Sequence, residues 1–174
     1  MLKIRSTKKK KSQEETMDQH SRRRVYFSLL AALLLQLLPF SGLLLQIKPD
    51  FLLLALLFWL LRAPQVCNVG IAWAAGIMMD LVSGDLFGQN ALAYTLTAFL
   101  ALIYQRRLIL FTVLQQSAYV FLLLLVNQAI LLMLKSFSGA EYFGWVYFMP
   151  SFTGILFWYA VLHSRYSFNF MAHK

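Results

Sequence analysis

The stretch that decides the fold reads Gly76-Ile77-Met78-Met79-Asp80-Leu81-Val82-Ser83-Gly84-Asp85-Leu86-Phe87-Gly88. Its three glycines and its first carboxylate, Asp80, stand at intervals of four residues. Residues four apart share one face of a helix, so this face would lack side chains around an acid. Residues 69–79 are all apolar or small, which puts Asp80 in, or at the end of, a membrane-embedded segment. An acid at the centre of a membrane helix costs about 2.5–3.5 kcal/mol and usually faces protein or a cavity.

Two interpretations of this face remain open. In the first, Gly76 only allows close packing between helices of the same chain. In the second, the face forms an interface or a pocket, with Asp80 as its polar anchor. Gly84 and Gly88 are expected beyond the helix, in a turn that requires positive φ. The Asp80 carboxylate would then either accept hydrogen bonds from N–H groups of that turn or contact a ligand or partner.

The composition is that of a membrane protein. The chain of 174 residues is 60% apolar with a mean hydropathy of +0.63, whereas soluble domains are about 45–50% apolar. Nine of the sixteen Lys and Arg residues lie within residues 1–24. We therefore predict a basic cytoplasmic tail over 1–24, an all-α transmembrane domain over 25–163 and a short cytoplasmic tail over 164–174.

Charge predicts the membrane topology, because Lys and Arg accumulate in cytoplasmic loops. With six crossings and the N-terminus inside, five Lys and Arg after residue 24 lie inside and two, Lys48 and Lys135, lie outside. If the short second segment did not cross, the count would be one inside against six outside. Six transmembrane helices with both termini cytoplasmic are therefore expected. The predicted segments are Val25–Ile47, Phe51–Leu61, Val66–Val82, Ala91–Tyr104, Leu108–Leu134 and Phe143–His163.

Motifs for catalysis and metal binding are missing from the sequence. It has no His-x-x-x-His, Glu-x-x-His or Cys-x-x-Cys pair, no phosphate-binding Gly-Lys-Ser/Thr loop and no Gly-x-Ser-x-Gly turn. The single Cys67 has no nearby histidine, which argues against a catalytic thiol. We therefore expect no enzymatic activity, no cofactor and no metal site.

Two basic clusters precede the first segment. They lack interleaved aromatic residues and adjoin a membrane span, so binding to nucleic acid is not expected. Basic residues near a membrane surface gain about 1 kcal/mol each from anionic lipid, and we expect the clusters to contact lipid and to fix the orientation of the chain. The clusters are Lys8, Lys9, Lys10 and Lys11, and Arg22, Arg23 and Arg24.

An ordered series of residues in the first half resembles a known family. Lys48-Pro49-Asp50-Phe51 is followed by Trp59, Pro64 and Gly70, and then by Gly76-x-x-x-Asp80-Leu81-x-Ser83-Gly84-x-x-x-Gly88. This series resembles the bacterial rod shape-determining protein MreD family over about residues 29–103. The second half is similar mainly in hydropathy and length. The long Lys-rich tail departs from many family members, so its role is open.

The resemblance implies a non-enzymatic component of the cell-elongation complex in the bacterial cytoplasmic (inner) membrane. It would support lateral peptidoglycan synthesis and rod shape as a scaffold for partner membrane proteins. The implied partners are the bitopic protein MreC, the polymerase RodA, a class B penicillin-binding transpeptidase and, indirectly, actin-like MreB filaments. A homodimer is also compatible with the sequence. The implied interface or structural motif comprises Gly76, Asp80, Gly84, Gly88, Lys48, Pro49, Asp50 and Trp59.

The resemblance also supplies an alternative function. The MreD family resembles in fold the six-helix substrate-capture subunits of energy-coupling-factor transporters, which implies a small-molecule or lipid-binding membrane subunit of a transporter. Such a subunit should carry Ala-x-x-x-Ala patches on its first helix. The first segment has only Ala31-Ala32 and is dominated by leucine, which disfavours the alternative.

Overall fold

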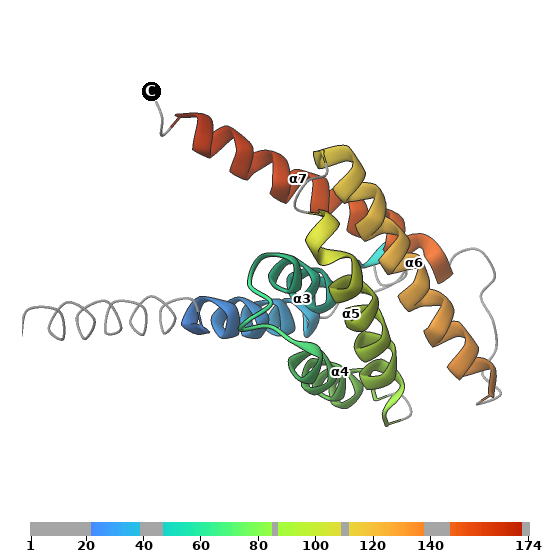
Figure 1. The fold of residues 1–174 in the computed structure, drawn as a ribbon. Helices are drawn as coiled ribbons and strands as arrows, with labels where there is room; N and C mark the ends of the chain where they lie inside the picture. Colours follow the sequence, from blue (N-terminus) through green and yellow to red (C-terminus); the bar gives the residue numbers. More distant parts are fainter. Residues whose placement is uncertain (1–21, 39–46, 85–86, 109–111, 138–146, 172–174) are drawn as a thin grey trace, which may run out of the picture.

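The computed structural model describes residues 22–38, 47–84, 87–108, 112–137 and 147–171, and most of these residues are helical. The predicted lipid-binding residues Lys8 to Lys11 lie outside the described residues, as does the segment 39–46 of the first predicted span. The helices, drawn in Figure 1, are residues 22–36, α3 (Phe51–Arg62), α4 (Val69–Ser83), α5 (Gln89–Leu108), α6 (Val113–Phe137) and α7 (Met149–Met171).

The short helix α3 lies at the centre of the molecule. Seven of its residues are buried, on more than one face of the helix, as expected for a helix that other elements surround. Helix α5 packs against α3, α4 and α6, and α6 and α7 run side by side (Figure 1). The core therefore forms where α3 and α5 meet, with Leu56, Leu57, Leu60, Tyr94 and Ala98 fully enclosed.

Among the described residues, α6 is the one helix that is both long enough and apolar enough to cross a membrane. Helices α3 and α4 are apolar but shorter. With 12 residues, α3 would be about 18 Å long at 1.5 Å per residue, less than the hydrocarbon core of about 30 Å. The number of crossings and the cytoplasmic location of both termini stay predictions.

The structure corrects several boundaries that were predicted from hydropathy. Helix α4 begins at Val69 rather than Val66, because the Asn68 side chain caps it by accepting a hydrogen bond from the Ile71 backbone at 3.2 Å. Helix α5 continues through residues 105–107, which were expected to form a loop, and through Leu108, which was expected to begin the fifth segment; α6 begins only at Val113, and α7 continues to Met171. Arginine and glutamine are good helix formers, so a polar run can end the apolar segment without ending the helix.

Candidate functional site

The Asp80 carboxylate joins the end of α4 to the start of α5. Asp80 is only 1% exposed. One of its oxygens accepts the backbone N–H of Asn90 at 2.8 Å. The other accepts the N–H groups of Gly88 at 3.0 Å and of Ala91 at 3.3 Å. The first N–H groups of a helix have no partner within it, and a negative charge there is stabilising, so Asp80 caps α5 from a neighbouring helix.

The glycines of the motif make this arrangement sterically possible. Gly84 ends α4 in the left-handed conformation with φ of 66°, and Gly88 has φ of 99°; both values favour glycine. A Cβ atom on Gly76 would lie 2.7 Å from the Ala91 nitrogen and 2.7 Å from the Asn90 carbonyl oxygen. Gly76 thus allows the backbones of α4 and α5 to touch. This contact is packing between helices of the same chain, the first of the two interpretations of the glycine face.

The Asp80 carboxylate accepts a hydrogen bond from the Gly88 N–H of the turn, as the sequence predicted, and further hydrogen bonds from the start of α5. The Gly84 N–H donates to the Asp80 main-chain carbonyl at 3.1 Å, and the carboxylate reaches across to α5. The sequence does not reveal this partner, because it depends on where α5 begins. The sequence did contain one indication of where α5 begins, the polar pair Gln89-Asn90 after Gly88. This pair lies within the first turn of α5.

A second acid, Asp50, caps the central helix α3. One oxygen accepts the Leu53 backbone N–H at 3.0 Å, and the other accepts the hydroxyl of Tyr94 on α5. Burial raises the pKa of Asp50, an effect that the hydrogen bonds from Tyr94 and Leu53 partly offset. Tyr94 is fully buried, and sequence reasoning did not identify it as part of the site.

Lys48 anchors the same loop to the N-terminal helix. Its ammonium group donates to the main-chain carbonyls of Gln36 and Leu38, at 3.3 Å in the second case. Burial lowers the pKa of Lys48, and the charge of Asp50 partly offsets this. Pro49 lies between these two residues and is half-buried. The run from Lys48 to Asp50 thus ties helix 22–36 to α3 and α5.

Trp59 lies apart from both acids and makes a separate contact between helices. Its indole N–H donates to the hydroxyl of Ser28 in helix 22–36, and its ring meets Phe58 edge to face. The residues of the first basic helix turn, Arg22, Arg23 and Arg24, are exposed.

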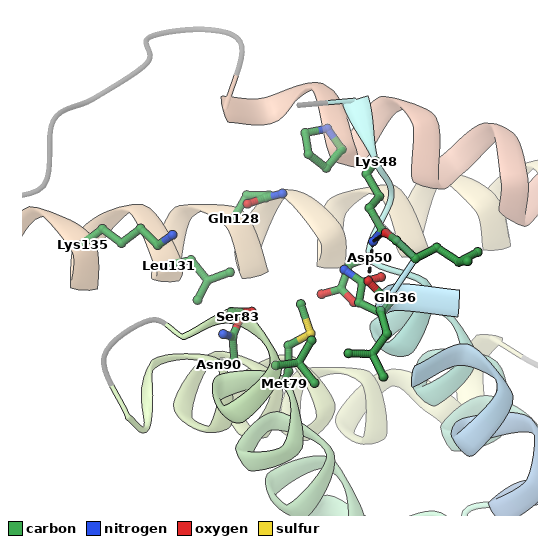
Figure 2. A pocket seen from close by; sticks show the side chains of 13 residues that line it. Gln36, Lys48, Asp50, Met79, Ser83, Asn90, Gln128, Leu131 and Lys135 are labelled. Carbon is green, nitrogen blue, oxygen red and sulfur yellow. Dashed lines mark hydrogen bonds between the residues drawn. The ribbon is translucent and has the colours of Figure 1, made fainter. Parts of the chain in front are cut away.

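A polar pocket of about 570 Å³ lies where the loop, α4, α5 and α6 come together. Figure 2 shows Lys48, Asp50 and Gln36 on one side, Ser83 and Asn90 on the α4–α5 side, and Gln128 and Lys135 along α6. The predicted site residues Lys48 and Asp50 line this pocket. Gly76, Asp80, Gly84, Gly88, Pro49 and Trp59 are not among its lining residues.

No group of three or more histidine, cysteine or acidic side chains gathers in the part of the chain that the structure describes. The site and fold define a class of protein: a helical bundle with a membrane-length apolar helix, in which buried carboxylates join helix ends to one another.

Comparison with known proteins identifies the family within this class. The profile of the family described as rod shape-determining protein MreD matches residues 21–164. The chain belongs to the MreD family, whose members are membrane proteins of the bacterial cell envelope with a role in rod shape determination. The rod shape-determining protein MreD of Haemophilus influenzae is 27% identical over 129 residues, covering 73% of this chain and 78% of that relative. No solved structure matches the chain.

Proposed function

We propose that this chain is a non-enzymatic scaffold of the bacterial cell-elongation complex, which supports lateral peptidoglycan synthesis and rod shape by holding partner membrane proteins. The role of the MreD family in rod shape determination supports the biological setting. The proposed partners are the bitopic protein MreC, the polymerase RodA, a class B penicillin-binding transpeptidase and, through them, MreB filaments.

The scaffold proposal rests on the hydrogen bonds of Asp50 and Asp80, the two acids in the described part of the chain. An acid that performs general acid or base chemistry needs access to a substrate. Both carboxylate oxygens of Asp80 accept hydrogen bonds from backbone N–H groups. Those of Asp50 accept hydrogen bonds from the Leu53 N–H and the Tyr94 hydroxyl. These bonds fix the positions of helices, which is what an assembly platform requires.

An apolar groove of about 400 Å³ between helix 22–36, α3 and α7 suits a transmembrane helix of the bitopic partner. Ser28, Ala31, Ala32 and Leu35 line one side of it, at the spacing of a single helix face. Small side chains let membrane helices approach closely and are common where such helices pack. We propose this groove as the contact with the membrane helix of MreC.

Depletion and cross-linking test the proposal. Depleting the protein should turn rods into spheres, and co-purification in mild detergent should recover MreC. A cysteine at Ala31 should cross-link to cysteines placed along the MreC membrane helix. A cysteine at Leu34 is the matched control, because Leu34 is 57% exposed on the same helix but does not line the groove. Normal rods after clean deletion contradict the scaffold role, and equal cross-linking at both positions contradicts the groove.

A second candidate function is a small-molecule or lipid-binding membrane subunit of a transporter, and the pocket of about 570 Å³ favours it. The two functions make different predictions for a depleted strain. A transporter subunit should reduce the uptake of a vitamin or similar solute while leaving shape intact. A scaffold should change shape while leaving uptake intact.

A further inference from the structure

The apolar groove between helix 22–36, α3 and α7 has two different walls. Mostly small side chains of helix 22–36 line one wall, and aromatic rings of α3 and α7 line the other. The rings pack edge to face: Phe58 meets Trp158 with ring centroids 6.1 Å apart, and Phe51 meets Phe157 at 5.5 Å. Such ring pairs are stabilising in themselves, so the aromatic wall is a well-packed surface.

The two tryptophans of the aromatic wall differ in their hydrogen bonding. The indole N–H of Trp59 donates to the Ser28 hydroxyl, which in turn donates to the Val25 carbonyl at 2.9 Å. Trp158 is 3% exposed, and no group in the described part of the chain accepts its indole N–H. Buried donors are nearly always hydrogen-bonded, because an unpaired one destabilises the fold. The groove therefore has a donor in its wall that lacks an acceptor.

The depth of Trp158 in the membrane restricts what can supply this acceptor. Trp158 lies five residues before His163, the predicted inner end of the last span, which is about 8 Å along a helix at 1.5 Å per residue. Lipid ester groups lie at the edge of the hydrocarbon core, and the acyl chains beyond them carry no acceptor. Water is absent from the core as well. A neighbouring membrane helix does reach this depth, and its side chains include hydroxyl groups.

The chain itself shows which acceptor suits a buried tryptophan. The Ser28 hydroxyl donates to a carbonyl of its own helix and accepts the N–H of Trp59. Ser117 and Thr95 likewise donate to carbonyls of their own helices, at 2.8 Å and 2.6 Å. A serine or threonine thus satisfies its O–H within its helix and keeps lone pairs for a donor on another helix. A hydroxyl on a helix in the groove would meet Trp158 as Ser28 meets Trp59.

We propose that the groove receives a transmembrane helix that presents a serine or threonine hydroxyl level with Trp158, and that this hydroxyl accepts the Trp158 indole N–H. Ala31 and Ala32 on the opposite wall let such a helix approach closely. The Trp158 ring lines the groove while its nitrogen is covered by neighbouring groups, so docking includes a turn of the indole that brings the N–H to the groove. The inference rests on the scaffold function proposed above and adds the chemistry of the partner helix.

The test measures the affinity of the purified full-length protein for full-length MreC in detergent, together with its melting temperature. Trp158 is replaced, through an amber codon, by β-(3-benzothienyl)alanine, an isostere in which sulfur replaces the indole N–H. The replacement removes the donor and keeps the size of the ring. The same replacement at Trp73 is the matched control, because Trp73 on α4 is 55% exposed and does not line the groove. Replacement at Trp59 is a second comparison, because its N–H is bonded within the chain.

We expect the isostere at Trp158 to weaken MreC binding about three- to tenfold, the effect of one hydrogen bond between membrane helices, and to leave the melting temperature unchanged. At Trp73 neither quantity should change, and at Trp59 the melting temperature should fall. Serine and threonine residues of the MreC membrane helix are also replaced by alanine one at a time. One of these changes should weaken binding to the wild type by the same factor and have no effect on the protein with the isostere at Trp158.

Two results overturn the inference and leave the scaffold proposal standing. The first is wild-type affinity for MreC in the protein with the isostere at Trp158, which is the result expected if a lipid chain fills the groove. The second is an MreC membrane helix in which no serine or threonine shows the coupling to Trp158. If the wild-type protein does not bind MreC at all, the scaffold proposal loses its main partner and this inference fails with it.

Discussion

Replacing Asp80 by alanine removes the acceptor for three backbone N–H groups at the start of α5. The two shorter bonds measure 2.8 Å to the Asn90 nitrogen and 3.0 Å to the Gly88 nitrogen. Hydrogen bonds to charged groups contribute about 1.5–3 kcal/mol each, so losing these two should cost roughly 3–6 kcal/mol. Folded domains have about 5–15 kcal/mol of stability in total. Asp80→Ala should therefore unfold readily in detergent and fail to restore rod shape.

Asp80→Asn tests the same geometry more finely. The asparagine keeps one acceptor oxygen, which can face either the Asn90 N–H or the Gly88 and Ala91 pair. Its NH₂ group then faces a donor that it cannot satisfy. We expect a loss of roughly 1.5–3 kcal/mol, half that of the alanine variant. If Asp80 acted through an ion pair instead, asparagine would fail as completely as alanine.

The control for this series lies at the other end of α4. Asn68 caps the helix with one hydrogen bond to the Ile71 backbone at 3.2 Å, at an exposed site. Asn68→Ala should cost about 1 kcal/mol. The assays are unfolding in detergent and complementation of rod shape at equal membrane levels of each variant. An Asp80→Ala protein as stable as Asn68→Ala would refute the capping role and return the motif to ordinary membrane packing.

Three further predictions address the backbone contact, the topology and the tail. Gly76→Ala should lower stability by about 1–3 kcal/mol in detergent melts, because its Cβ meets the α5 backbone. Gly70→Ala, whose Cβ meets the side-chain oxygen of Asn68 at 3.3 Å rather than backbone, should cost less than Gly76→Ala. A reporter that is active outside the cytoplasm should work when fused after Lys135 and fail after Arg107; the reverse contradicts six crossings. Replacing residues 8–11 with glutamine should leave this pattern unchanged, since arginines next to the first span remain.

Hydropathy located the helices better than it located their ends. The expected start of the fourth segment was Ala91, yet α5 begins at Gln89, because the Asp80 carboxylate satisfies its first N–H groups. Hydropathy marks where a chain enters or leaves an apolar environment, whereas caps and turns decide where a helix begins and ends. The spacing of the glycines did carry information about turns, and it predicted the turn at Gly84 and Gly88.

Partners across the fold could not be predicted from one sequence. Tyr94 is 44 residues from Asp50 along the chain, and the periodicity of a helix says nothing about which neighbour it meets. The same holds for Gln128, an amide on α6 that makes no hydrogen bond to another described helix. Asn127, one residue earlier, does make one, with Thr97 of α5 at 3.4 Å. A shift of one residue turns a side chain by about 100° around a helix with 3.6 residues per turn, so only the packed structure distinguishes the two.

The two parts of the sequence motif converge on one turn of α5, which explains why they occur together. Asp80 holds the backbone N–H groups at Asn90 and Ala91, and Asp50 holds the hydroxyl of Tyr94. Asn90 and Tyr94 are four residues apart and so lie on one side of the helix. The start of α5 is therefore fixed both by α4 and by the loop before α3. This turn also forms the Asn90 wall of the polar pocket, so the acids that stabilise the bundle also hold that wall in position.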